Sequence, residues 1–385
     1  MRRIAERKRR WRKRREPTPR RLIGGPLARA DMIHPLNASS APNSSTSSTS
    51  SALCVTSLYD LSCPPSDLTP AGCSALLCTL LGAVVITVAG NLFIVLSILF
   101  FRQLQSRSNV LVASLAVADL LVGLLIMPFS AARTAYNCWF YGDLFCRLHT
   151  WLDFSTCTSS IANLACISLE RYASIAEPLR YRQMVTPRVL AAMLLLSWSG
   201  LPLYGATFML GWNLVGIKRQ VAESSCRHDC RVYMNPASTA TNVLVAYVTP
   251  MLLMIVANAK IHRLAQAQAR RIEGSAMVSG RDDRASTKRE HNATRTLGII
   301  TGAFILLWMP YFILVASEPL LGYGTSRAAW EVVCWLPYLN SAVNPVLLMV
   351  FNRSFNGAFR LALKGRVLKS GCRGIDLFNF RDGNM

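Results

Sequence analysis

The chain has 385 residues, of which 52% are hydrophobic and only 16% are charged. With a mean hydropathy of +0.30, it is too apolar for an ordinary soluble enzyme of this length, which indicates a membrane protein with several spans. The formal net charge is +22, yet residues 1–31 alone hold thirteen Lys or Arg against three acids. Because nearly half of the excess lies in one tail, the charge distribution argues against a fold that binds nucleic acid throughout. The apolar composition makes membrane lipid the expected partner.

Residues 1–72 are predicted to form an extracellular N-terminal segment in two parts. Residues 1–31 are a basic run without hydrophobic periodicity, which favours a solvated, disordered tail over a nuclear-localisation or RNA-binding segment. Residues 37–51 are rich in Ser and Thr and contain two N-glycosylation sequons, at Asn37 and Asn43. A sequon has meaning only outside the cytoplasm, so we expect this segment on the extracellular side.

Seven apolar stretches follow, and each is long enough to cross about 30 Å of hydrocarbon. They lie at residues 73–101, 109–132, 145–174, 189–210, 237–261, 296–317 and 331–351. The sequence shows no internal repeat of the transporter kind. It therefore predicts an all-α membrane protein in which residues 73–351 form a seven-transmembrane helix bundle. Residues 352–385 are predicted to form a short amphipathic eighth helix and a cytoplasmic tail.

Basic residues gather in the loops on one side of these spans, which the positive-inside rule assigns to the cytoplasm. They are Arg102, Arg107, Arg180, Arg182, Arg188 and the basic residues of 260–295 and 353–373. The predicted protein is a multi-pass protein of the plasma membrane with an extracellular N-terminus. The basic tail then lies outside as well, which conflicts with the same rule.

Polar side chains at mid-depth in the spans are few, and they are predicted to cluster. Asp119 lies in the second span, Ser160 in the third, and Asn340, Ser341 and Asn344 in the seventh. A carboxylate at that depth needs a cation or hydrogen-bond donors. We expect a small polar pocket suited to a sodium ion and water, with a purely structural hydrogen-bonded network as the alternative.

Charged residues near the ends of the third and sixth spans share one spacing. Asp153 and Arg171 are eighteen residues apart, which is five helical turns, or about 27 Å, on one face. An unpaired charge in hydrocarbon costs about 2.5 kcal/mol or more, so both residues need a partner or a watery cavity. Glu290 and Trp308 have the same separation in the antiparallel sixth span. If Glu290 pairs with Arg171, Trp308 comes level with Asp153.

Aromatic residues are predicted to surround Asp153. Tyr311 and Phe312 follow Trp308 by one turn, and Tyr338 lies in the seventh span. A carboxylate among aromatic faces suits a protonated amine, because the rings add cation–π attraction to the charge-assisted hydrogen bond. We expect no Lys or Arg near the depth of Asp153 in the other spans, so a purely structural tie between helices is the weaker alternative.

Several motifs together resemble those of rhodopsin-like (class A) G-protein-coupled receptors, over roughly residues 73–365. They are GN at 90–91, SLAVADLLVG at 114–123, ERY at 170–172, the FxxxWxP pattern at 304–310 and NSAVNP at 340–345. Within the aminergic group the chain is most similar to trace amine-associated receptors. The stretches that carry this finer resemblance are LHTWLDFSTC at 148–157, CRHDC at 226–230 and WLPYLNSAVNP at 335–345.

The resemblance implies a signal transducer, not an enzyme, that binds a small amine and activates a heterotrimeric G protein, usually the stimulatory type with a rise in cyclic AMP. The implied ligand site is Asp153, Cys157, Trp308, Tyr311, Phe312, Tyr338 and Asn242. The implied activation residues are Glu170, Arg171, Tyr172, Glu290, Ile161, Pro250, Phe304, Asn344 and Pro345. The implied disulfides join Cys146 to Cys230 and Cys63 to Cys226. No cofactor is implied apart from the allosteric sodium ion.

Two departures from the family pattern leave alternatives open. Leu348 and Asn258 stand where the family has tyrosines whose hydroxyls meet through water in the open state, so a receptor that signals weakly is one alternative. Another is a serotonin-like aminergic receptor. The fifth span lacks the paired serines of catecholamine sites, which makes catechol recognition the less favoured case.

Overall fold

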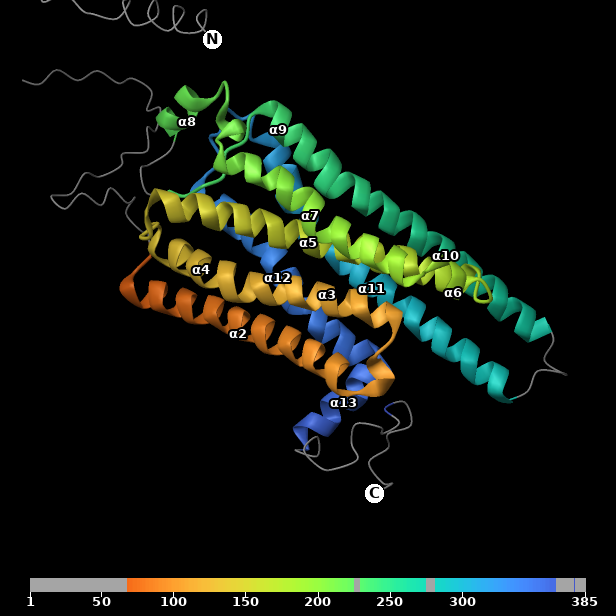
Figure 1. Cartoon of the computed structure of the whole chain (residues 1–385). Helices are drawn as coiled ribbons and strands as arrows, with labels where there is room; N and C mark the ends of the chain where they lie inside the picture. Colours follow the sequence, from red (N-terminus) through yellow and green to blue (C-terminus); the bar gives the residue numbers. More distant parts are fainter. Residues whose placement is uncertain (1–67, 225–228, 275–280, 365–376, 378–385) are drawn as a thin grey trace, which may run out of the picture. The chain divides into compact units, whose positions relative to one another are not determined.

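The computed structural model describes residues 68–224, 229–274, 281–364 and 377, and it describes the backbone alone for residues 201, 223–224, 268–274 and 281–297. In this part of the chain the regular structure is helical throughout, and the long helices run side by side (Figure 1). The predicted sequons Asn37 and Asn43 and the predicted pair Cys63 and Cys226 lie outside the described residues.

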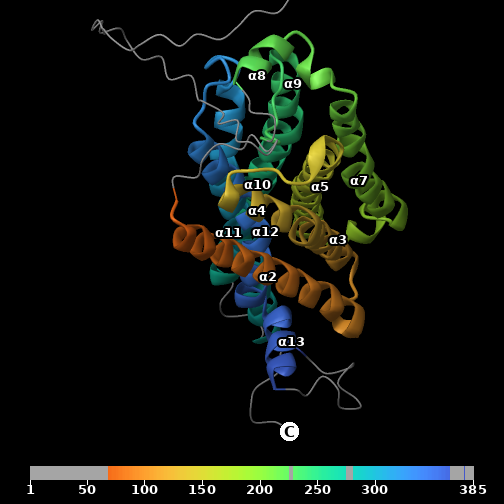
Figure 2. The same ribbon diagram turned by 90° about the vertical axis from the view of Figure 1, so that its left-hand side faces the viewer.

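The long helices correspond in order to the seven predicted spans. They are α2 (Pro70–Phe100), α3 with η2 and α4 (Arg107–Leu121, Val122–Ile126, Met127–Tyr136), α5 (Gly142–Ala176), α7 (Pro187–Met209), α9 with η4 and α10 (Pro236–Thr241, Asn242–Val248, Thr249–Gly274), α11 (Arg281–Ser317) and α12 (Arg327–Phe351). The connections contain η1 (Arg102–Leu104), α6 (Tyr181–Met184), η3 (Trp212–Leu214) and α8 (Lys218–Ser224). The final helix, α13 (Arg353–Leu363), follows α12 directly and lies beyond one end of the bundle of long helices (Figure 2).

Helix α5 is the central element of the bundle. It packs against α3, α7 and α10, and also contacts α11 and η4. Six helices in the described part of the chain are long and apolar enough to cross a membrane by length and composition, and α5 falls outside that set. The reason is its content of Ser, Thr, Asp153, Glu170 and Arg171, which protein contacts can accommodate because α5 is enclosed by other helices.

Two spans contain a π-helical turn, and each turn ends two residues before a proline. The segment η2 ends at Ile126, before Pro128, and η4 ends at Val248, before Pro250. Proline has no backbone N–H, and its ring clashes with the carbonyl four residues earlier, so a widened turn relieves the conflict. Both wide turns lie in the half of the bundle that the sequence predicts to be extracellular.

The described helices extend beyond several predicted boundaries. The second span was predicted to end at residue 132, but α4 continues to Tyr136 and thus includes Arg133. The fifth helix ends at Gly274 and the sixth begins at Arg281, so both extend beyond the predicted spans. Charged residues end an apolar pattern without ending a helix, which explains why hydrophobicity alone made these spans too short.

The predicted eighth helix is the amphipathic helix α13. The side chain of Asn352 accepts a hydrogen bond from the Ser354 amide and thereby caps its first turn. Its apolar face, including Phe355 and Leu361, is buried in the same core cluster as residues of α2 and α3. Leu377 packs into this cluster too, and its amide donates to Gln103 at 2.8 Å.

Candidate functional site

A cavity lies between side chains of α5, η4, α11 and α12, in the half of the bundle that the sequence predicts to be extracellular. All seven residues of the predicted ligand site line it: Asp153, Cys157, Asn242, Trp308, Tyr311, Phe312 and Tyr338. The structure therefore brings together residues that are up to 185 positions apart in the sequence. Their placement follows from α5 and α11 running in opposite directions, as the eighteen-residue spacings suggested.

Asp153 is the acid of this cavity. Its carboxylate accepts hydrogen bonds from the Tyr338 hydroxyl at 2.7 Å and from the Cys157 thiol at 3.3 Å. Both donors are neutral, so neither cancels the negative charge. They hold the carboxylate in one orientation while leaving it able to pair with a cation.

Aromatic rings of α11 form the wall beside Asp153. The rings of Trp308 and Phe312 stack at 5.7 Å, and Tyr311 meets Trp308 edge-on at 6.1 Å. Tyr247, from η4, stacks on Phe312 at 4.3 Å and extends the wall. A cation between this wall and Asp153 meets one carboxylate and several π faces, each worth about 0.5–2 kcal/mol.

Asn242 contributes an amide to the far side of the cavity. It is the first residue of η4. The side chain is 3% exposed, and its Oδ1 has no hydrogen-bond partner. A buried acceptor without a partner is costly. It therefore offers a site for a donor on the part of a ligand remote from its ammonium group.

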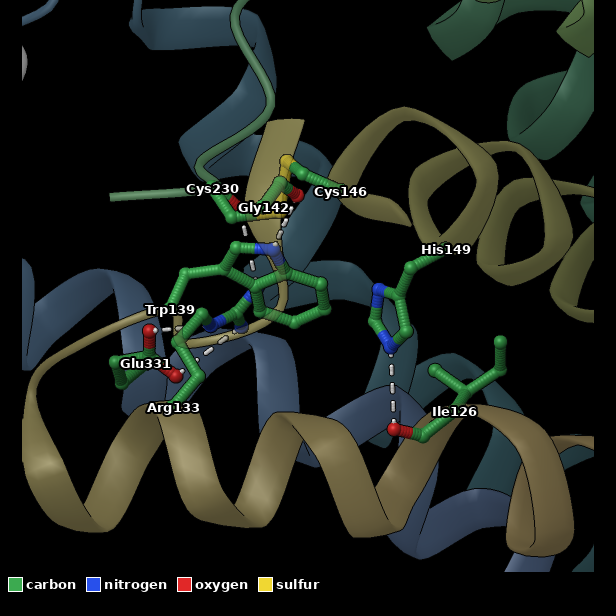
Figure 3. The surroundings of a disulfide bond; sticks show 8 residues. All are labelled: Ile126, Arg133, Trp139, Gly142, Cys146, His149, Cys230 and Glu331. Carbon is green, nitrogen blue, oxygen red and sulfur yellow. Dashed lines mark hydrogen bonds and ion pairs between the residues drawn. A yellow bond between two sulfur atoms is a disulfide. The ribbon is translucent and has the colours of Figure 1, made fainter. Parts of the chain in front are cut away.

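Arg133 corrects one expectation about the site. The sequence predicted no Lys or Arg near the depth of Asp153, but Arg133 of α4 lines the same cavity. Its Nε lies 3.0 Å from Glu331 of α12 (Figure 3). Glu331 also accepts a hydrogen bond from the Thr134 hydroxyl at 2.6 Å. The error came from ending the second span at residue 132, four residues before the end of α4. A buried acid near the start of the seventh span was the signal that a partner was needed.

The π-helical turn η2 is hydrogen-bonded to a side chain of α5. The ring of His149 lies one turn outside Asp153 on α5, and its Nε2 donates to the Ile126 carbonyl at 3.2 Å (Figure 3). Ile126 ends η2. The histidine thus ties α5 to the second span where that span departs from α-helical geometry.

The mid-depth polar residues converge on Asp119. Its carboxylate accepts hydrogen bonds from Ser160 and Ser341 on one oxygen, at 2.9 and 2.8 Å, and from Asn344 on the other, at 2.8 Å. Asn340 is equally buried, but none of the described hydrogen bonds joins it to Asp119, and its Oδ1 has no hydrogen-bond partner. The group offers oxygen ligands, including the unpartnered Oδ1 of Asn344, which is the donor set that a hard cation requires.

The cytoplasmic end of α5 holds the ERY residues. Glu170 is buried and accepts hydrogen bonds from Ser108 at 2.8 Å and from Tyr181. Arg171 lies 3.7 Å from Glu170. Burial, reinforced by the Glu170 carboxylate, raises the pKa of Tyr181 to about 12, so its hydroxyl stays a donor. The Lys260 ammonium lies 5.4 Å from the centre of the Tyr172 ring, in a cation–π contact. Glu290 is the predicted partner of Arg171, and its side chain is not among those that the structure describes.

Continuous packing connects the two ends of the bundle. Trp308, at the base of the cavity, lies 6.0 Å from the ring of Phe304, which is fully buried. Ile161 of α5 belongs to the same core cluster. The ring of Pro345 packs directly against Gly90 of α2. A Cβ atom at position 90 would lie only 2.7 Å from the Pro345 ring. This contact explains the glycine of the GN motif.

The sequence profile of the 7 transmembrane receptor (rhodopsin family) matches residues 90–348. The chain belongs to this receptor family. It is 50% identical to trace amine-associated receptor 365 of Petromyzon marinus over 336 residues, which cover 87% of this chain and 92% of that one. It is 39% identical to trace amine-associated receptor 7h of Rattus norvegicus, over 77% of this chain and 84% of that one. It is 38% identical to trace amine-associated receptor 7e of Mus musculus, over 86% of this chain and 94% of that one.

The receptor has the disulfide that the resemblance implied. Cys146, in the first turns of α5, is bonded to Cys230 in the outer loop before α9. Cys157, Cys166 and Cys334 are free thiols within the spans. The bond fixes the outer loop to the extracellular end of the central helix (Figure 3).

The two departures from the family pattern lie in the cytoplasmic half of the receptor. Leu348 lines a second cavity together with Arg171 and Ile300. Asn258 faces α11 instead, where its Nδ2 donates to the Thr301 hydroxyl at 2.8 Å. Neither side chain provides the tyrosine hydroxyl that the family pattern has at its position.

Restoring both tyrosines is expected to raise basal and maximal signalling. A water-bridged pair is worth about 1 kcal/mol, or roughly fivefold in the open population. Leu348→Tyr with Asn258→Tyr should therefore exceed the sum of the single variants in a cyclic AMP assay. Thr301→Val is the control, because it removes only the bond to Asn258. An additive double variant would show that the two positions do not meet in this receptor.

Proposed function

We propose that this receptor binds a protonated amine from outside the cell, with Asp153 as its counter-ion, and activates a stimulatory G protein that raises cyclic AMP. The observation that carries the proposal is a carboxylate held by two neutral donors beside an aromatic wall. The relatives are named for trace amines. The orientation follows the basic loops, with the N-terminus outside the plasma membrane.

The ligand acts by shifting a conformational equilibrium. An amine favours the open state only as far as it binds that state more tightly, and such couplings are typically about 1–3 kcal/mol. Trp308 lies under the amine and touches Phe304, which packs with Ile161 and lies on α11 about two turns from Pro310. Movement of α11 would then expose Arg171 and the basic cytoplasmic surface to the G protein.

A sodium ion at Asp119 is part of the proposal. Asp119 is fully buried, and its described contacts are Ser and Asn side chains, which do not neutralise it. Sodium would supply the missing positive charge. Asp119, Ser160, Ser341 and Asn344 would hold it, and the alternative of a purely structural network rests on the same hydrogen bonds.

The test is a panel of amines applied to cells that express the full chain, with cyclic AMP as the readout. The panel pairs 2-phenylethylamine with its neutral analogue 2-phenylethanol and includes serotonin and aliphatic amines. We expect responses to amines only. A response to the neutral alcohol at equal concentration would contradict the role of Asp153, and a preference for serotonin would favour the serotonin-like alternative. Amine binding without cyclic AMP would contradict the coupling.

A further inference from the structure

A second cavity, which we call the loop cavity, lies between the outer loop before α9 and the adjoining ends of α5 and α7. Its lining also includes residues of η3 and α8 and the disulfide of the outer loop. Three side chains, those of Thr150, Phe208 and Val232, line both the loop cavity and the cavity around Asp153. The two cavities are therefore neighbours that share one wall and differ in the rest of their lining.

Asn213 of η3 is a buried residue of the loop cavity with an unsatisfied acceptor. It is 8% exposed and lines the cavity. Its Nδ2 donates to the Tyr233 carbonyl at 2.8 Å, whereas its Oδ1 has no hydrogen-bond partner in the described part of the chain. The Asn213 carbonyl accepts from the Asn235 amide at 2.7 Å, so the backbone of η3 is held as well. A buried acceptor without a partner is costly, and an N–H or O–H group of a ligand would satisfy it.

The charged residues that line the loop cavity leave one cation without a counter-ion. Asp229 lies 2.8 Å from Arg327 and is paired with it. Arg231 is paired in the same way with Glu318, at 3.0 Å. Arg147 of α5 also lines the cavity, and it is exposed. Among the residues that the structure describes, no acid forms an ion pair with Arg147. The uncompensated charge at the loop cavity is therefore positive, which favours an anion.

Much of the remaining lining of the loop cavity is apolar. Phe208, Leu214, Val221 and Val232 contribute hydrocarbon and aromatic surface, and Tyr233, which is 5% exposed, adds a ring. Sites for small molecules are typically concave and apolar, with a few polar groups that set the orientation of the ligand. The loop cavity has this composition, with one buried acceptor and one exposed cation as its orienting groups.

We propose that the loop cavity binds a small organic carboxylate that carries an N–H or O–H group, and that this anion raises the affinity of the neighbouring cavity for its amine. The carboxylate pairs with Arg147, and the N–H or O–H group donates to the Oδ1 of Asn213. The apolar body of the ligand packs against Leu214 and Val221. The site itself does not depend on the proposed function, whereas the coupling rests on it.

The direction of the coupling follows from the charges on α5. Arg147 and Asp153 are six residues apart on this helix, which is about 9 Å along its axis. The charge of Arg147 therefore opposes an ammonium ion bound at Asp153. A carboxylate in the loop cavity cancels that charge from the other side of the shared wall. By reciprocity, a bound amine also tightens binding of the carboxylate.

Indole-3-acetate is the probe, because its flat apolar ring carries one N–H and one carboxylate. Two analogues each lack one of these features: 1-methylindole-3-acetate has no N–H, and indole-3-acetamide has no charge. Binding to the purified full-length receptor is titrated by saturation-transfer-difference NMR. We expect loss of the N–H to weaken binding by about tenfold, because the buried acceptor stays unpaired. Loss of the charge should weaken it by about fivefold, because Arg147 is exposed.

Variants of Arg147 test the same contact from the side of the receptor. Arg147→Met should weaken indole-3-acetate to the level of the amide and leave the affinity for the amide unchanged. Arg147→Lys keeps the charge and should retain most of the affinity. Lys218→Met removes an exposed cation of the same outer loop that does not line the cavity. It is the matched control and should change no affinity.

The coupling is measured as the cyclic AMP response to 2-phenylethylamine with and without saturating indole-3-acetate. We expect the anion alone to give no response and to raise the potency of the amine by about fivefold, at the lower end of typical allosteric couplings. The increase should be absent in Arg147→Met and present in Lys218→Met. In the binding assay, excess 2-phenylethylamine should not displace indole-3-acetate.

Absence of saturable binding, or equal affinities for the three ligands in the unchanged receptor and in Arg147→Met, would overturn the site. Displacement of indole-3-acetate by 2-phenylethylamine would place the anion in the cavity around Asp153 and would overturn it too. Selective binding without any change in amine potency would contradict the coupling. Selective binding by a receptor that responds to no amine of the panel would support the loop cavity and contradict the proposed function.

Discussion

Asp153→Ala is expected to abolish the amine response while the receptor remains at the cell surface. Removing one partner of a buried, hydrogen-bonded charge pair costs about 2–5 kcal/mol or more, so potency should fall by at least about 30-fold. Tyr338 and Cys157 lose an acceptor in this variant, but both are neutral and tolerate the loss more readily than a charge would. Cyclic AMP dose–response curves, normalised to surface labelling, measure the effect.

Matched variants separate charge from shape at this position. Asp153→Asn keeps the size and one acceptor but loses the charge, so it should behave almost like Asp153→Ala. Tyr338→Phe keeps the charge and removes one 2.7 Å hydrogen bond, for which we expect a loss of about three- to tenfold. Normal potency in Asp153→Asn would contradict the counter-ion role. A Tyr338→Phe effect as large as that of Asp153→Ala would show that orientation matters more than charge.

Arg133→Met is expected to lower the folded amount of the receptor severely. Arg133 and Glu331 have side chains 7% and 9% exposed, and the methionine leaves the Glu331 carboxylate buried beside Thr134 alone. Breaking a buried pair on one side costs about 3–5 kcal/mol, which is a large part of the stability of a typical domain. Surface labelling and thermal unfolding of the purified receptor measure the loss.

The double variant Arg133→Met with Glu331→Leu tests the cause. Replacing both charges by apolar groups of similar volume is often neutral or stabilising, so this receptor should regain most of its surface amount and melting temperature. Arg147→Met, at an exposed arginine on the same extracellular end, is the control and should change neither. If the double variant is as unstable as Arg133→Met, the arginine acts through its bond to Cys230 and not through Glu331.

Much of the fold was predictable because membrane spans are recognisable in a sequence as long apolar runs. The cavity was also predictable in outline: a pairing of Glu290 with Arg171 would bring Trp308 level with Asp153, and these last two residues line one cavity. The sequence pattern missed Arg133 because a charge at the end of an apolar run looks like a loop. It also missed the two wide turns, whose effect on side-chain direction depends on local backbone geometry and not on hydrophobic periodicity.

Contacts between distant loops were beyond the reach of sequence reasoning for a different reason. The pairing of Arg231 with Glu318 depends on how a short segment crosses the cavity, and an acid or a base in a loop has many candidate partners. Asn258 is a similar case. Its difference from the family tyrosine was visible, but its bond to Thr301 on the neighbouring helix was not.

The polarity of α5 has a consequence for biosynthesis. Helix α5 has 35 residues and is less apolar than the six helices that qualify as membrane spans by composition. The free energy gained by moving it alone from the translocon into lipid is therefore small. We expect it to partition into the bilayer together with a neighbour, as a hairpin with α4 or α7. Substitutions on the apolar surface of α4 or α7 would then cause α5 to insert incorrectly during synthesis. Chaperones would retain such a chain, even though the substituted residues lie far from any ligand.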